Sequence, residues 1–119
     1  MRYVFLFVAL TFILSCSNFL LIKEIDPTNE MSSIYEPFIE KGFCLSPSGI
    51  YNIQVGGWMS APMPLCNKSD TVMHTHPIWA EQFANFIDFI VWEEYYKLYG
   101  NVLFGVEGKG WVKVYERRK

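Results

Sequence analysis

One long helical stretch, residues 79–99, limits what this chain can fold into more than any other feature. Gly100 follows it, and glycine commonly ends a helix because it adopts the left-handed conformation without strain. The other apolar segments are short and are bounded by Gly, Pro and polar residues, which favours strands. A chain of 119 residues allows one domain, and 18% aromatic residues exclude intrinsic disorder. The pattern therefore predicts an α+β domain, a small mixed sheet with one long helix packed on it.

The expected elements follow from turn residues and alternation. Residues 34–40 are expected to form a short helix or a turn, and residues 46–49 and 107–110 are expected to be tight turns. The strands are expected at 42–45, 50–55, 71–76, 101–106 and 111–115, with a long loop at 56–69. Pro77 ends the third of these strands.

The N-terminus has the pattern of an export signal. Residues 3–14 form an apolar run after Arg2, shorter than the roughly 20 residues that a membrane-spanning helix needs. Ser15 and Cys16 follow it, and this junction resembles the lipobox of bacterial lipoproteins, in which the cysteine is lipidated. We therefore interpret residues 1–15 as a lipoprotein signal peptide, 16–33 as a tether and 34–119 as the folded domain. An ordinary cleaved signal and an uncleaved anchor are the alternatives. The interpretation predicts a cell-envelope protein held to the membrane by lipid on Cys16.

Two further cysteines, Cys44 and Cys66, would then lie in an oxidising compartment. They are expected either to form a disulfide or to pack as two buried thiols. A cysteine zinc site is not expected, because neither residue belongs to a CxxC pair. The net charge of −2 and the lack of an extended basic segment argue against a nucleic-acid partner.

The two histidines of the chain, His74 and His76, are two residues apart on an expected strand. Side chains at that spacing point to the same face, so both imidazoles can reach one metal ion. Asp88 lies in the apolar run 86–92, where an unpaired carboxylate would be costly to bury. It therefore needs a hydrogen-bonding partner, water or a metal. The alternative is that Asn85 caps a helix of which Asp88 is the third residue, so that Asp88 serves the cap, and capping and metal binding can coexist.

These residues carry a resemblance to a known family. The run His74-Thr75-His76-Pro77, seven residues and then Asn85-Phe86-Ile87-Asp88 resembles the JAMM signature of JAB/MPN metallopeptidases, which reads His-x-His-Pro, seven residues, Ser-x-x-Asp. The resemblance implies a JAB/MPN-like fold, with His74, His76 and Asp88 as ligands of Zn²⁺. It also implies a glutamate on an early strand as general base, for which Glu40 fits better than Glu36. Asn85 stands where the family has Ser, and an amide can still donate a hydrogen bond to an oxyanion.

The resemblance implies a zinc-dependent hydrolase of amide bonds. Export favours a peptide, an isopeptide or a cell-wall amide as the substrate. The loop 56–69, with Trp58, Met59, Met63 and Leu65, is expected either to form a wall of a substrate groove or to pack on its own side chains. The alternative function is a non-catalytic envelope lipoprotein that uses the same fold as a binding or immunity module.

Overall fold

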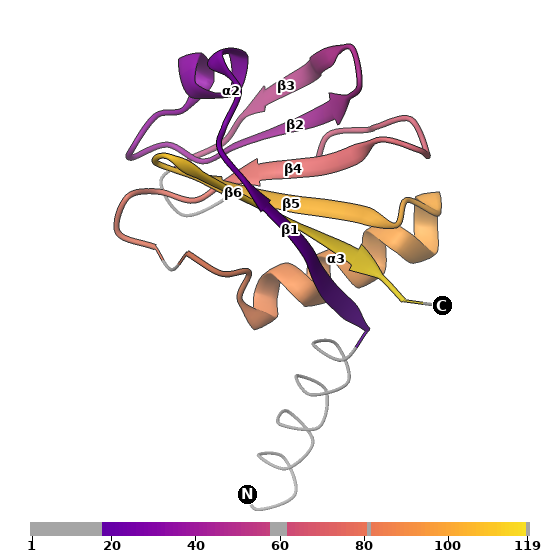
Figure 1. The fold of residues 1–119 in the computed structure, drawn as a ribbon. Coiled ribbons are helices and arrows are strands. Elements are labelled where there is room, and N and C mark those ends of the chain that lie inside the picture. Colours follow the sequence, from indigo (N-terminus) through magenta and orange to yellow (C-terminus); the bar gives the residue numbers. More distant parts are fainter. Residues whose placement is uncertain (1–17, 58–61, 81, 119) are drawn as a thin grey trace, which may run out of the picture.

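Six strands form one mixed sheet in the order β1-β6-β5-β4-β2-β3. The computed structural model describes residues 18–57, 62–80 and 82–118, so the expected signal peptide and Cys16 lie outside the described residues. Along the chain the elements are β1 (Phe19–Ile25), α2 (Asn29–Ile34), β2 (Lys41–Ser46), β3 (Gly49–Val55), β4 (Thr71–Thr75), α3 (Phe86–Tyr99), β5 (Leu103–Gly108) and β6 (Trp111–Arg117). The fold is α+β, and in the described ranges it combines this mixed sheet with two helices, one of them 14 residues long (Figure 1).

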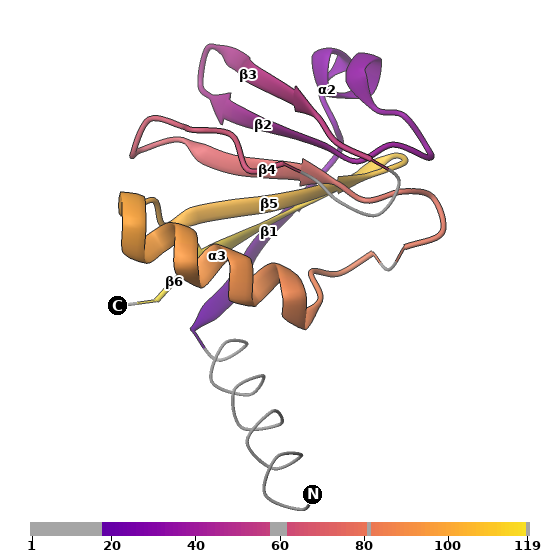
Figure 2. The same ribbon diagram turned by 180° about the vertical axis from the view of Figure 1, so that it is seen from behind.

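The parallel pair at the centre of the sheet explains where the long helix lies. β4 and β5 run parallel, whereas every other neighbouring pair is antiparallel. Parallel neighbours cannot be joined by a tight turn and need a crossover connection. Helix α3 is that connection, and it lies across one face of the sheet (Figures 1 and 2).

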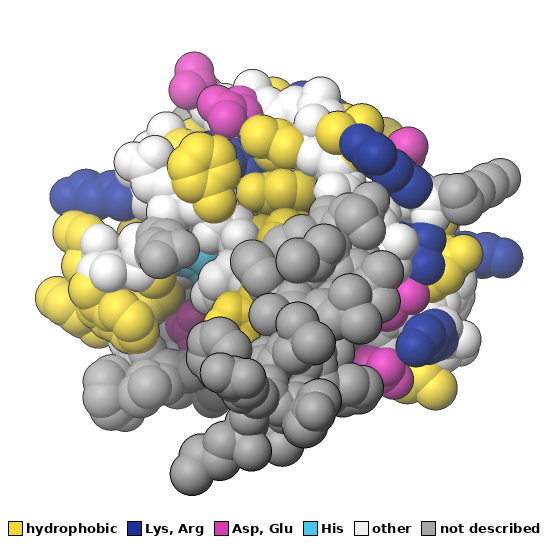
Figure 3. Space-filling model, turned by 90° about the horizontal axis from the view of Figure 1, so that it is seen from below, with side chains coloured by type: hydrophobic (Ala, Val, Ile, Leu, Met, Phe, Trp, Pro, Cys, Tyr) yellow, Lys and Arg dark blue, Asp and Glu magenta, His cyan; other side chains and the backbone are white. Residues whose placement is uncertain are grey.

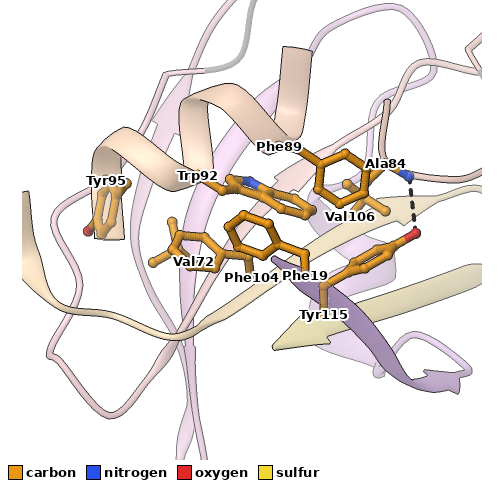
Figure 4. Close-up of a cluster of buried hydrophobic side chains, with 9 residues drawn as sticks. All are labelled: Phe19, Val72, Ala84, Phe89, Trp92, Tyr95, Phe104, Val106 and Tyr115. Atoms are coloured by element: carbon orange, nitrogen blue, oxygen red, sulfur yellow. Dashed lines mark hydrogen bonds between the residues drawn. The ribbon is translucent and has the colours of Figure 1, made fainter. Parts of the chain in front are cut away.

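Both faces of the sheet are buried, each against a different cluster of apolar side chains. Successive side chains of β4 point to opposite faces and so enter different clusters. Val72 points to the face covered by α3, and Met73 points to the other face. The larger cluster gathers around Trp92, which stacks on Phe104 with ring centroids 5.4 Å apart (Figure 4). On the opposite face Met31 of α2 packs with the core residues Phe43, Met73, Val112 and Val114.

The long helix is shorter than the sequence pattern predicts. It begins at Phe86 and not at residue 79, because Asn85 forms a complete capping box with Asp88 at that point. Its C-terminal end agrees with the expectation, since Gly100 has a φ of 79° and donates its N–H to the carbonyl of Tyr96. Residues 77–80 and 82–85 therefore belong to the connection between β4 and α3.

The prediction that residues 16–33 form a tether is wrong for the part of that segment that the structure describes. Residues 19–34 belong to the folded sheet and helix layer, because β1 pairs with β6 at the sheet edge and α2 packs on the core through Met31. Phe19 is buried and contacts Phe89, Trp92 and Phe104 with ring centroids 5.6–5.7 Å apart. The domain thus begins before residue 34.

A disulfide joins Cys44 of β2 to Cys66 of the following loop. It indicates a protein that matures in an oxidising, extracytoplasmic compartment. Within the described ranges, no helix has the length and apolar character needed to cross a membrane.

Candidate metal centre

The register of β2 against β4 brings three predicted site residues to one end of the sheet. Gly42 pairs with His74 in this antiparallel ladder. Continuing the register by two residues on each strand places Glu40 opposite His76, and all of these positions share the face covered by α3. The backbone N–H of His76 donates to the carbonyl of Glu107 at 2.7 Å, and the hydroxyl of Tyr35 donates to the carbonyl of His76 at 2.8 Å. These two bonds hold the His76 backbone beyond the end of β4.

Asp88 completes the group from the first turn of α3. Its Oδ1 lies 3.1 Å from Nε2 of His74, and its Oδ2 lies 3.2 Å from Nε2 of His76. Both imidazoles are buried, and Asp88 is mostly buried. Burial alone would raise the pKa of Asp88, but hydrogen bonds from His74 and His76 outweigh it and hold that pKa well below its usual range. Asp88 is therefore an ionised carboxylate at neutral pH.

Asn85 fixes the orientation of that carboxylate. Its side-chain Oδ1 accepts the N–H of Asp88 at 3.0 Å, while Oδ2 of Asp88 accepts the N–H of Asn85 at 2.9 Å. The helix cap and the carboxylate that faces the histidines are thus one arrangement, so both roles considered for Asp88 are present in the geometry.

The donor set fits a divalent transition metal. His74, His76 and Asp88 each offer one ligand atom, and these atoms lie within 4.8 Å of one another. Zinc bonds of about 2.0–2.1 Å in a tetrahedron place neighbouring ligand atoms about 3.3 Å apart, close to the two His–Asp separations. Two imidazoles and one carboxylate also leave a fourth position for water or substrate, as catalytic zinc sites do. This buried group can hold a metal ion, and its chemistry suits zinc.

The five residues expected as zinc ligands or catalytic groups line one cavity of about 460 Å³. These residues are Glu40, His74, His76, Asn85 and Asp88, and the remaining walls are the apolar side chains of Met63, Trp79, Ala80, Ile87, Val91 and Trp92. The volume is in the range of small-molecule and peptide pockets. A metal held by the three ligands would therefore stand at the end of a cavity with room for part of a substrate.

The structure distinguishes the two glutamates considered for the general base. Glu40 lines the cavity, and its backbone is held by hydrogen bonds to Gly56 and Gly57. Glu36 pairs instead with Lys41 at 2.8 Å and has no place in the cavity lining. Burial raises the pKa of Glu40, the two histidines lower it, and Asp88 raises it, with a net upward shift. A carboxylate with a raised pKa is a stronger base than an exposed one.

Of the four apolar side chains that the sequence suggests as a groove wall in loop 56–69, the described part of the loop contributes one to the cavity. Met63 lines the cavity, whereas Leu65 is largely exposed, and Trp58 and Met59 lie outside the described residues. A side chain at Gly42 would overlap the carbonyl oxygen of Pro62. The absence of a side chain at position 42 thus lets the loop approach β2 and carry Met63 to the cavity.

Sequence reasoning missed Trp79, Ile87 and Val91 as cavity residues. It placed Trp79 inside the helix and took the apolar start of α3 only as surroundings for Asp88. The sequence did contain a signal for Ile87 and Val91. Residues 86–92 are apolar at almost every position, whereas one buried helix face requires apolar residues only at every third or fourth position.

No family model, curated protein or solved structure matches this chain.

Proposed function

We propose that this protein is an exported zinc-dependent hydrolase of amide bonds, of the JAMM type. The observation that carries the proposal is the convergence of His74, His76 and Asp88 in the same cavity as Glu40. A structural role alone needs no glutamate beside the three ligand groups and no open cavity in front of them.

His74, His76 and Asp88 would hold the zinc. When bound there, zinc supplies a Lewis acid that lowers the pKa of water and polarises a carbonyl. The carboxylate of Glu40 accepts the proton from the attacking water and later delivers it to the departing amine. The raised pKa of Glu40 makes its carboxylate a better proton acceptor than an exposed glutamate.

Asn85 has a positioning role in this proposal. Its Oδ1 accepts the N–H of Asp88, so the oxygen of the amide is engaged in the cap. The NH₂ group of the same amide remains the chemically suitable donor for a developing oxyanion, since Asn85 also lines the cavity.

The substrate class follows from the compartment. The disulfide supports an extracytoplasmic location, where peptides, isopeptides and cell-wall amides are the available amide substrates. Attachment to the membrane through lipid on Cys16 belongs to the same proposal, which predicts a membrane-anchored enzyme of the cell envelope.

The test compares wild type with Glu40→Gln. The full chain, loaded with zinc, is assayed against a panel of peptides and muropeptides. Glu40→Gln should retain bound zinc and lose amide cleavage, because Gln is nearly isosteric but accepts no proton. Glu36→Gln is the matched control and should cleave at the wild-type rate. Equal cleavage by wild type and Glu40→Gln would overturn the role of Glu40 as general base, whereas no cleavage of any substrate would favour the non-catalytic binding module.

A further inference from the structure

The cavity in front of the metal ligands has an apolar wall that the proposed chemistry does not use. Trp79 is 57% exposed and Ile87 is 58% exposed, and both line the cavity together with Val91, which is 38% exposed. Large apolar side chains that gather at a cavity mouth mark a binding surface, because exposing them to water costs free energy.

Helix α3 changes character along its length. Its first two turns expose only apolar side chains, Phe86, Ile87, Ile90 and Val91, whereas its later part mixes the charged Glu93, Glu94 and Lys97 with the exposed Leu98 and Tyr99. Ile87 and Val91 are four residues apart, so they lie one turn apart on the same helix face. That face borders Asp88, and the apolar surface is therefore continuous with the metal centre.

Exposed apolar side chains in the connection before α3 extend the apolar surface beyond the cavity. Ile78 and Phe83, in the connection before α3, are 53% and 54% exposed. Figure 3 shows hydrophobic side chains gathered on the side of the molecule where this connection and the start of α3 lie, with a histidine visible beside them. Whatever occupies the metal end of the cavity thus meets an apolar surface next to it.

The charges that line the cavity limit which substrate side chain can bind there. The described residues that line the cavity include the carboxyl groups of Glu40 and Asp88 but no Lys or Arg. An acidic side chain would find no cationic protein group there, and any charged side chain would lose hydration against the apolar wall. An uncharged apolar side chain is instead stabilised when it buries its surface against the same wall.

We propose that this cavity selects peptides with a bulky, uncharged apolar side chain, such as Leu or Phe, next to the scissile amide. That side chain packs against Trp79, Ile87 and Val91 while the amide carbonyl lies at the metal end. The inference deepens the proposed function and rests on it for the identity of the ligand as a peptide.

The experiment measures peptide binding separately from cleavage. Blocked tetrapeptides that differ at one position, occupied by Leu, Phe, Ala or Asp, are titrated into zinc-loaded, full-length Glu40→Gln protein, and binding is followed by tryptophan fluorescence. The Leu and Phe peptides should bind roughly tenfold or more tightly than the Ala peptide, and the Asp peptide should bind most weakly. Ile87→Ser and Val91→Ser in the same background should remove most of this preference. Leu98→Ser is the matched control, because Leu98 is 72% exposed on the same helix but has no place in the cavity lining, and it should leave the preference intact.

The outcomes separate the inference from the proposed function. Equal binding of the Leu, Phe and Ala peptides, or a preference that survives Ile87→Ser and Val91→Ser, overturns the inference. Cleavage by wild type without regard to the varied residue overturns it too, while the proposed function stands. Selective binding of Leu and Phe peptides without cleavage by wild type supports the apolar selectivity and overturns the hydrolase. A surface used for lipid would instead show a fluorescence response to phosphatidylcholine vesicles that Ile87→Ser abolishes, with no response to the peptides, and this also overturns the inference.

Discussion

Asn85 and Asp88 cap each other at the start of α3, each accepting the backbone N–H of the other at 3.0 and 2.9 Å. The same Oδ2 of Asp88 faces His76 at 3.2 Å. A local helix-capping motif therefore orients a carboxylate that the fold presents to two histidines. The stability of the helix end and the geometry of the candidate metal centre are coupled through this pair.

The cap predicts how substitutions at Asn85 behave. Asn85→Ala should lower the free energy of unfolding by about 1 kcal/mol, because the N–H of Asp88 loses its acceptor. It should also weaken zinc affinity, because Asp88 loses its orientation. Asn85→Ser should preserve both, since Ser caps a helix about as well. Urea unfolding and zinc titration measure the two effects. Thr28→Ala is the control, because Thr28 caps α2 away from the cavity and should affect stability but not zinc affinity. Unchanged zinc affinity in Asn85→Ala would contradict the coupling.

Metal binding should stabilise the fold through the three ligands. Zinc at 100 times its dissociation constant should add about 2.7 kcal/mol to the free energy of unfolding, because only the folded chain presents the site. His76→Ala and Asp88→Asn should abolish the zinc-dependent increase in melting temperature and the zinc content of the purified protein. Glu36→Gln should retain both, since Glu36 lies outside the cavity lining. Zinc stabilisation that persists in His76→Ala would place the metal elsewhere.

The disulfide should contribute strongly to stability. Reduction of Cys44–Cys66, which are 22 positions apart in sequence, should cost about 2–4 kcal/mol because the unfolded chain regains the freedom of the closed loop. The measurement is the urea midpoint with and without dithiothreitol. The double variant Cys44→Ala, Cys66→Ala should match the reduced wild type in stability and should not respond to dithiothreitol. A wild-type midpoint that is insensitive to the reductant would refute this.

Glu107 should make stability fall as the pH rises. It is 0% exposed, its two carboxyl oxygens have no hydrogen-bond partner among the described residues, and burial raises its pKa to about 8, partly offset by Lys41. Its folded pKa is above its unfolded value of 4.5, so the folded state binds more protons between these values. Its contribution is complete below about pH 4.5 and is lost towards pH 8, by at most about 1.4 kcal/mol per pH unit. Glu107→Gln should flatten this dependence in urea titrations at a series of pH values. Glu94→Gln, which changes an exposed glutamate of α3, should keep the wild-type slope, and an equally steep slope in Glu107→Gln would rule out the assignment.

The signal peptide expected at residues 1–15 predicts lipid attachment at Cys16. Wild type should incorporate labelled fatty acid and partition with membranes, whereas Cys16→Ala should lose the label. Equal labelling of the two forms would exclude lipidation at Cys16. A labelled wild type that becomes soluble only after proteolysis near the N-terminus would agree with the anchor.

Local chemistry in the sequence was enough to predict most of the elements and the composition of the site. Pro77 and Gly100 mark ends that depend on the backbone of their own neighbours, so the end of β4 and the C-terminal end of α3 could be placed from them. Asn85 marks the N-terminal end of α3, which only the capping interpretation of Asp88 had indicated. The helix pattern alone extended the helix back to residue 79, because apolar residues continue into the connection that lines the cavity. The His-x-His spacing predicted two imidazoles on one face for the same local reason, since alternation along a strand is a property of the backbone.

Tertiary structure decided what depends on partners distant in sequence. The segment 19–25 becomes an edge strand only because β6 offers it a ladder, and its own pattern after an apolar leader does not reveal that. The pairing of Gly42 with His74 brings Glu40, and not Glu36, to the cavity, and this register depends on packing on both faces of the sheet. Sequence spacing left Cys44 and Cys66 as a disulfide or two thiols, and their Cα separation of 5.4 Å in the fold allows the bond. Residue types and short spacings thus predicted the candidate ligand residues, while the strand register determined which groups meet.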